Sequence, residues 1–177
     1  ACLKAVISGS DKDIISSDDT IVIVSTTKAN IQEEIATPII SDMDKLKNEF
    51  SLQHNPIVIS NACVSGVMAM NTANNYLQAK KYKNAFVIGA DVISNFVLFG
   101  FQSLYAVSDE PCQPFDKNRK GISLGEGAGG VLMSINDDVF KTQCFEFKEG
   151  TSSNDANHIS GPSRTGEGLY RTINNTL

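Results

Sequence analysis

The sequence contains no tryptophan, two histidines and four cysteines, and these scarcities exclude several kinds of site. The histidines, His54 and His158, are far apart, and no two cysteines form a C-x-x-C pair. A zinc site needs closely spaced cysteine and histidine ligands, so we expect no metal and no other cofactor. Widely spaced cysteines without a secretion signal favour a reduced, cytoplasmic protein.

Basic residues are also fewer than acidic residues. The chain has 15 lysine and arginine residues and 20 aspartate and glutamate residues, which gives a net charge of -5. Binding to nucleic acid needs clustered basic side chains that contact phosphates. The two tight basic clusters, at 80–83 and 117–120, are too short to reverse the acidic balance. We therefore expect no nucleic-acid partner.

Long hydrophobic runs are missing as well. Two long stretches carry no charge. Residues 55–79 are rich in asparagine. Residues 92–108 contain several polar residues and are shorter than the roughly 20 apolar residues of a membrane helix. We therefore expect no contact with a membrane. The chain opens at Ala1 with no basic segment ahead of an apolar one, and we expect it to be an internal fragment of a longer polypeptide.

Apolar, β-branched segments alternate with segments of helical spacing along the chain. This alternation predicts an α/β protein whose mostly parallel sheet is covered on both faces. The expected strands are 20–27, 56–60, 85–90 and 130–134, with 144–148 as a candidate fifth. The expected helices are 42–50, 63–80 and 96–105, with another beginning at 166.

The segment around Cys63 is the most informative in the chain. It predicts a strand, a tight turn and a helix, with Cys63 near the helix start. Free N–H groups and the positive end of the helix dipole favour the thiolate there, and the Cys63 N–H could face an oxyanion. An inert, buried Cys63 is the alternative from position alone. Spacing places neither histidine beside Cys63; we expect His54 at the far end of the strand.

The glycine-rich segment 125–130 satisfies the pattern G-x-G-x-x-G, but in the wrong context. A dinucleotide-binding loop follows a strand and opens a helix, whereas this segment follows a polar loop and enters a strand. We expect close backbone packing where that strand enters the core. Glu126 would then be a buried or half-buried acid that needs hydrogen-bond donors.

Three stretches together resemble the elongating (type I/II) β-ketoacyl-acyl-carrier-protein synthases of the thiolase-like superfamily. They are 61–66 (NACVSG), 114–129 (PFDKNRKGISLGEGAG) and 152–159 (SSNDANHI), and the spacing of Gly89-Ala90-Asp91 and Gly100-Phe101 agrees. The resemblance runs from about residue 57 to 171. It implies a layered α-β-α fold. Residues 1–140 would form most of the N-terminal half of the duplicated domain, and 141–177 the start of the C-terminal half.

The resemblance also implies a reaction used in fatty acid biosynthesis. Cys63 would take an acyl group from an acyl carrier protein as a thioester. Malonyl carrier protein would lose CO2, and its carbanion would attack the thioester to give a 3-oxoacyl product, which is covalent catalysis by an acyltransferase. Acyl carrier protein and a second copy in a homodimer are the implied partners. The implied substrate-binding residues are Phe101 and Ala62, and Asp116, Arg119 and Glu126 would hold the loop near the site.

The chain also departs from the family pattern. The family's two catalytic histidines, in H-G-T-x-T and G-H segments, have no counterpart in these 177 residues. We therefore expect the chain alone to be inactive in condensation, although its full-length parent condenses. Two alternatives stay open: a non-condensing pseudoenzyme partner related to chain-length factors, which usually lack the cysteine, and a small α/β binding module in which Cys63 is incidental.

Overall fold

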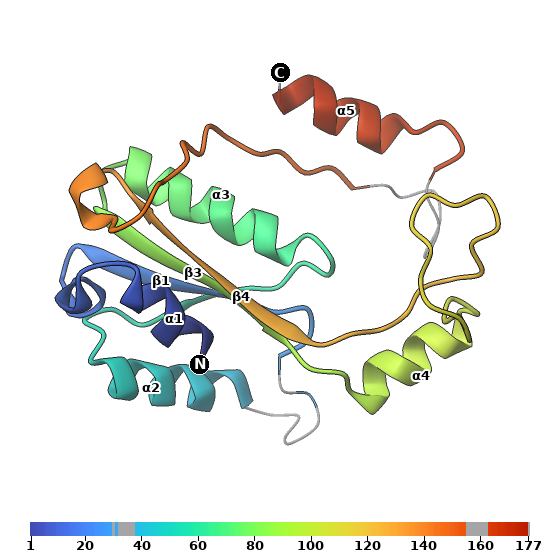
Figure 1. Ribbon diagram of the computed structural model, residues 1–177, viewed down its shortest axis with the longest axis horizontal. Helices are drawn as coiled ribbons and strands as arrows, with labels where there is room; N and C mark the ends of the chain where they lie inside the picture. The colour runs from blue at the N-terminus through green and yellow to red at the C-terminus, as the bar shows by residue number, and fades with distance from the viewer. Residues whose placement is uncertain (30, 32–37, 155–162, 177) are drawn as a thin grey trace. The chain divides into compact units, whose positions relative to one another are not determined.

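A computed structural model describes residues 1–29, 31, 38–154 and 163–176 (Figure 1). The chain forms two compact units. The first comprises residues 1–91 and 128–152, and the second comprises 92–127 and 153–175. The first unit holds the sheet and the segment around Cys63. Its elements are α1 (Cys2–Ser8), η1 (Lys12–Ser16), β1 (Thr20–Ser25), α2 (Pro38–Phe50), β2 (Ile57–Ile59), α3 (Ser65–Gln78), β3 (Asn84–Asp91), β4 (Gly127–Ser134) and η2 (Asp137–Val139).

The sheet has the strand order β2-β1-β3-β4. Strand β1 pairs in parallel with β2, where Ile23 lies opposite Ile57, and in parallel with β3. Strand β4 is antiparallel to β3. Ser134 Oγ donates to Asn84 Oδ1 at 2.8 Å, and the Ile135 N–H donates to the Lys83 carbonyl at 3.1 Å. The end of β4 thus lies at the start of β3, and three parallel strands carry one antiparallel edge.

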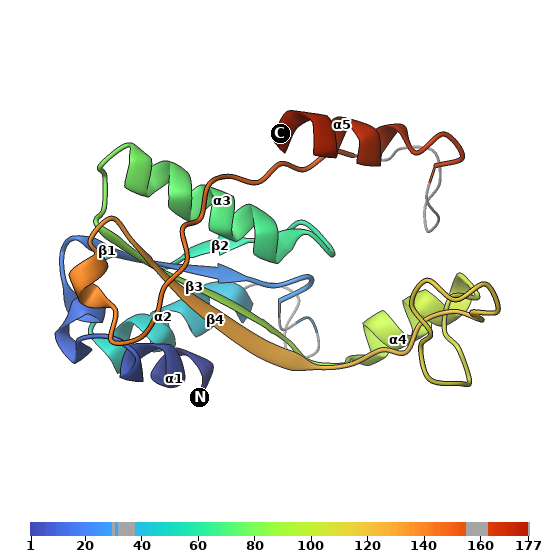
Figure 2. The ribbon, with the colours of Figure 1, turned by 45° about the horizontal axis from the view of Figure 1, so that its top comes forward.

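Helices cover both faces of this sheet (Figure 2). Successive side chains of a strand point to opposite faces. Ile21 and Ile23 of β1 therefore pack in one apolar cluster with the inner face of α3, while Val22 packs in a second cluster with residues of α1 and η1. Phe86 is the largest fully buried side chain and belongs to the second cluster. The result is the α-β-α layering that the sequence predicts.

The second unit contains α4 (Asn95–Ser103) and α5 (Glu167–Thr176). Ser94 caps α4, because its Oγ accepts the Val97 N–H at 3.3 Å. No residue of α4 is buried, and its Phe96 and Phe99 side chains are 63% and 61% exposed. The loop between α4 and β4 is closed by a bridge between Val107 and Ile122. This unit therefore presents an apolar helix to its surroundings.

The predicted order of strands and helices is confirmed, with three corrections. Residues 144–148 form no strand: they are irregular chain, and 144–147 line one wall of a groove. The helix predicted from Cys63 begins at Ser65. Helix α1 was not predicted; its seven residues are too few to be stable alone, and its buried Leu3 shows that packing stabilises it. In the described part of the chain, no helix has the length and apolarity needed to cross a membrane.

Candidate active site at the end of strand β2

Cys63 lies in the tight turn that connects β2 to α3. The Val64 N–H donates to the Asn61 carbonyl at 3.2 Å, and the Ser65 N–H donates to the Ala62 carbonyl at 3.2 Å. The Met68 N–H donates to the Val64 carbonyl at 3.0 Å, so Val64 is the N-cap and α3 begins at Ser65, two residues after Cys63. The Cys63 side chain is exposed. The alternative of a buried Cys63 is therefore wrong.

The turn is held in one shape by its own side chains. Ala62 has a φ of 44°, in the left-handed region that non-glycine residues rarely adopt. Ser65, only 4% exposed, accepts the Asn61 N–H at 2.8 Å through its Oγ and donates to the Ala62 carbonyl at 2.6 Å. A left-handed alanine persists only where its surroundings fix it. Ser65 is such a fixing contact, in the same turn that carries the exposed Cys63.

The turn lies at the carboxyl edge of the parallel strands. The Thr26 N–H donates to the Ile59 carbonyl at 3.2 Å, so the loop after β1 lies beside the end of β2. Ser60 Oγ donates to the Thr27 carbonyl at 3.4 Å. Asp91, the last residue of β3, accepts bonds from the same loop. Open α/β sheets bind their ligands at this edge.

Small residues let the start of α3 approach the sheet closely. A Cβ atom on Gly89 of β3 would lie 3.0 Å from Ser25 Oγ, and one on Gly66 of α3 would lie 4.0 Å from the same atom. Ser25 is 5% exposed. The end of β1, the end of β3 and the first turn of α3 therefore meet around this one hydroxyl group.

His54 lies near the amino-terminal ends of the parallel strands, opposite the carboxyl ends where Cys63 lies. Its Nε2 is 2.8 Å from the Asp18 carbonyl oxygen, just before β1, and its ring packs edge-to-face on Tyr82, just before β3, with centroids 5.0 Å apart. Since a carbonyl only accepts, Nε2 carries the proton. The prediction that His54 lies at the far end of the strand from Cys63 is confirmed. His158 lies outside the described residues.

The other predicted site residues belong to the second unit, whereas Ala62 and Cys63 belong to the first. Phe101 is half-buried in α4. Asp116 and Arg119 make a local turn: Arg119 Nη1 donates to the Asp116 carbonyl at 2.9 Å. Glu126 accepts the Ile93 N–H at 3.2 Å, but it is exposed, because the whole segment 125–130 is exposed. The prediction of a buried or half-buried Glu126 is wrong.

Close backbone packing in the glycine-rich segment is confirmed at one position. A Cβ atom on Gly130 would lie 2.7 Å from Val6 Cγ2 and 3.1 Å from Cys2 Sγ, so α1 packs directly on this part of β4. A Cβ atom on Gly125, Gly127 or Gly129 would meet nothing within 4 Å. The requirement for glycine here comes from α1, an element that the sequence pattern did not predict.

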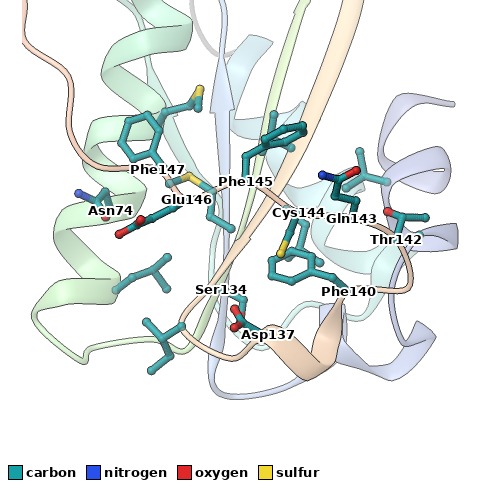
Figure 3. Close-up of a pocket in the computed structure, with 18 of the residues that line it drawn as sticks. Asn74, Ser134, Asp137, Phe140, Thr142, Gln143, Cys144, Phe145, Glu146 and Phe147 are labelled. Carbon is teal, nitrogen blue, oxygen red and sulfur yellow. The ribbon is translucent and has the colours of Figure 1, made fainter.

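The first unit also contains a groove of about 920 Å³ between β4, α3 and the chain that follows η2 (Figure 3). Phe140, Cys144 and Phe147 come from that following chain, and Asn74 comes from α3. Sequence reasoning missed this groove because it assigned its outer wall to a fifth strand.

Solved structures with the same fold are ketosynthases. The ishigamide ketosynthase/chain length factor matches 94% of this chain and 48% of its own, with a TM-score of 0.73 and 20% identity. A ketosynthase from Xenorhabdus doucetiae, solved in complex with its chain length factor, matches 94% of this chain and 45% of its own, with a TM-score of 0.67 and 22% identity. The chain therefore shares its layered α-β-α fold with these ketosynthases.

The sequence comparisons give the family. The model of the β-ketoacyl synthase N-terminal domain matches residues 45–138, more than half of the chain. The chain is 30% identical over 129 residues to the chloroplastic 3-oxoacyl-[acyl-carrier-protein] synthase I of Hordeum vulgare, covering 67% of this chain and 28% of that protein. It is 31% identical over 128 residues to 3-oxoacyl-[acyl-carrier-protein] synthase 2 of Rhizobium meliloti, covering 66% and 30%. The chain belongs to the β-ketoacyl synthase family. It spans less than a third of the length of these two relatives.

Proposed function

We propose that this chain is the nucleophile-bearing part of a longer ketoacyl synthase, and that Cys63 is the nucleophile. The observation that carries the proposal is the exposed Cys63 thiol in a fixed turn at the carboxyl edge of three parallel strands. A thiol held there is open to a substrate while the chain around it stays rigid. Small neighbours, Ala62 before it and Ser65 and Gly66 after it, leave space for an acyl group.

The proposed reaction has two parts. First, the Cys63 thiolate attacks the carbonyl carbon of an acyl thioester, a new C–S bond forms, and the carrier thiol leaves with its electron pair. Second, malonyl carrier protein loses CO2, and the carbanion so formed attacks the acyl carbon. A C–C bond forms, the Cys63 thiolate leaves, and a 3-oxoacyl thioester two carbons longer stays on the carrier. Dividing the condensation in this way replaces one difficult step by two easier ones.

The remaining roles are part of the same proposal. Phe101 and Ala62 contact the acyl group, and Asp116, Arg119 and Glu126 hold their loop near the site. Residues 1–140 belong to the N-terminal half of the duplicated domain, and 141–177 begin the C-terminal half. The names of the two relatives, both 3-oxoacyl-[acyl-carrier-protein] synthases, support acyl carrier protein as the partner. A cytoplasmic homodimer completes the proposal.

A non-condensing partner or a small binding module is not favoured. Two of the similar structures include a chain length factor beside a ketosynthase, so both kinds of protein deserve comparison. Such factors usually lack the cysteine, whereas this chain has Cys63 in the expected turn and exposes its side chain. An incidental cysteine would need neither that turn nor that exposure.

Mass spectrometry of the native gene product tests the proposal. The intact mass is measured before and after incubation with an acyl thioester of acyl carrier protein. We expect a native mass well above 19.1 kDa and one acyl adduct that maps to Cys63. Cys63→Ala should abolish the adduct, whereas Cys144→Ala, which removes another exposed thiol of the same unit, should retain it. An adduct that persists in Cys63→Ala, or none in the unaltered protein, would refute the proposal.

A further inference from the structure

We propose that Asp91 is a positioning residue for Cys63, acting through the loop that follows β1. This inference rests on the proposed function, because it assigns Asp91 a part in the acylation of Cys63. Asp91 ends β3, and Cys63 follows β2, the strand on the far side of β1. The two residues therefore belong to strands that do not pair with each other, and the loop after β1 lies between them in the order of the sheet.

The carboxylate of Asp91 is the anchor of that loop. Its Oδ1 accepts the Thr26 hydroxyl at 2.7 Å, and its Oδ2 accepts the Thr27 N–H at 2.9 Å. Having donated to Asp91, the Thr26 hydroxyl accepts the Ala29 N–H at 3.0 Å. Ala29 has a φ of 55°, so the loop turns sharply back at this residue. One side chain of β3 thereby fixes residues 26–29 of the loop after β1.

The anchored loop in turn holds the residues just before the nucleophile turn. The Thr26 N–H donates to the Ile59 carbonyl at 3.2 Å, and Ser60 Oγ donates to the Thr27 carbonyl at 3.4 Å. Ile59 and Ser60 lead directly into the turn that carries Cys63. A shift of the loop would therefore be passed to the backbone that places the thiol, and displacements of an ångström can slow a reaction about a hundredfold.

The arrangement calls for a carboxylate in particular. The Thr26 hydroxyl donates to Oδ1 of Asp91, and the Thr27 N–H lies nearer to Oδ2, at 2.9 Å, than to Oδ1, at 3.2 Å. Hydrogen bonds to an ionised acceptor are about twice as strong as neutral ones. An asparagine would offer one acceptor oxygen and would turn its NH2 donor toward the second donor. Glutamate keeps both acceptors on a longer side chain. Asp91→Asn should therefore release the loop, and Asp91→Glu should restore much of its anchoring.

The experiment measures Cys63 in the full-length protein in two ways. The first is the rate of acylation by an acyl thioester of acyl carrier protein, as a function of thioester concentration. The second is the rate of alkylation by iodoacetamide, measured by mass spectrometry for Cys63 relative to Cys112 and Cys144 in the same sample. Asp19→Asn is the matched control, because it removes an exposed carboxylate that bonds Lys83 beyond the other end of β1.

We expect Asp91→Asn to lower the maximal acylation rate by about tenfold or more while the half-saturating thioester concentration stays unchanged. Alkylation of Cys63 should change relative to Cys112 and Cys144, Asp91→Glu should recover most of both effects, and Asp19→Asn should show neither. Unaltered acylation in a folded Asp91→Asn protein, or equal losses in Asp91→Asn and Asp19→Asn, would overturn the inference.

The inference can also be tested if Asp91→Asn does not fold or if Cys63 accepts no acyl group. If Asp91→Asn does not fold, Thr26→Val removes the hydroxyl link at nearly constant volume and decides the question by the same measurements. If the unaltered protein accepts no acyl group at Cys63, the proposed function fails. The relative alkylation rates then still report whether Asp91 places the thiol: a change confined to Cys63 supports the inference, and no change overturns it.

Discussion

Ser65 Oγ donates a hydrogen bond of 2.6 Å to the carbonyl oxygen of Ala62, and this contact closes the turn that presents Cys63. Ala62 is held at a φ of 44°, a conformation that costs an alanine about 1 kcal/mol. The same hydroxyl accepts the Asn61 N–H at 2.8 Å, so one buried side chain bonds the backbone on both sides of the peptide that joins Asn61 and Ala62. The turn that carries the exposed Cys63 is therefore held by a buried residue.

Ser65→Ala is expected to loosen this turn. It removes two hydrogen bonds of about 1 kcal/mol each, so we expect a loss of about 1–2 kcal/mol in the free energy of unfolding, with slower acylation of Cys63. Urea denaturation and the acylation rate measure the two effects. Ser8→Ala is the control, because it removes an exposed hydroxyl bonded to the Ala5 carbonyl at 2.6 Å. If both variants acylate Cys63 as fast as the unaltered protein, Ser65 has no part in placing it.

Gly130→Ala is expected to strain the contact between β4 and α1. The new methyl group would lie 2.7 Å from Val6 Cγ2, and overpacking of this kind costs about 1–3 kcal/mol. Thermal unfolding should show the loss, and adding Val6→Ala should recover part of it. Gly129→Ala, whose methyl group would meet nothing within 4 Å, should not be destabilised. Equal thermal stability of the two alanine variants would contradict the close packing of α1 on β4 at Gly130.

The parts of the fold that the sequence predicts are those with strong local signals. Strands β1 and β3 are apolar runs with few polar interruptions, and α3 places small apolar residues at helical spacing, so their positions follow from pattern alone. The direction of β4 does not follow from its residues, because an apolar strand pairs in either sense. The short α1 lacks any signal of its own and forms through burial of Leu3.

The sequence predicts the turn that carries Cys63, but it does not predict the residues that hold this turn in place. Cys63 is found because strand, turn and helix signals meet there. Ser65 and Asp91 stand in segments that match the family, but their roles depend on hydrogen bonds that no local pattern reveals. The bond from Thr26 to Asp91 joins residues 65 apart in the sequence. Such a contact exists only once β1 and β3 have paired, so it belongs to the tertiary structure alone.

The ion pair between Lys4 of α1 and Glu49 of α2 gives a prediction about pH. The two charged groups are 2.8 Å apart, and the hydrogen bond from the Lys4 ammonium lowers the pKa of Glu49 below its ordinary value of 4.5. Lys4→Gln should raise the pKa of Glu49 toward that value, whereas Lys148→Gln, which breaks the exposed pair with Glu146, should not. NMR titration of the Glu49 carboxyl carbon measures both.

The sign of the stability effect follows from the direction of that shift. A carboxyl group whose pKa is lower in the folded state stabilises the fold above its unfolded pKa, and this contribution is lost as the pH falls through the folded value. The contribution of Glu49 is therefore present at neutral pH and disappears in acid. It should be small and weakened by salt, since both side chains are more than half exposed. An unchanged pKa in Lys4→Gln would show that the pair does not persist in solution.

The last prediction concerns condensation by the 177 residues alone. Decarboxylation of malonyl carrier protein leaves negative charge on the enolate oxygen, which needs hydrogen-bond donors beside the Cys63 thioester. His54 is at the opposite edge of the sheet, and the family's H-G-T-x-T and G-H segments do not occur in this sequence. The chain incubated with acyl and malonyl carrier proteins should yield no 3-oxoacyl product by mass spectrometry, whereas the full-length protein should yield it. Product from the 177-residue chain that vanishes in Cys63→Ala would show that these segments are not required.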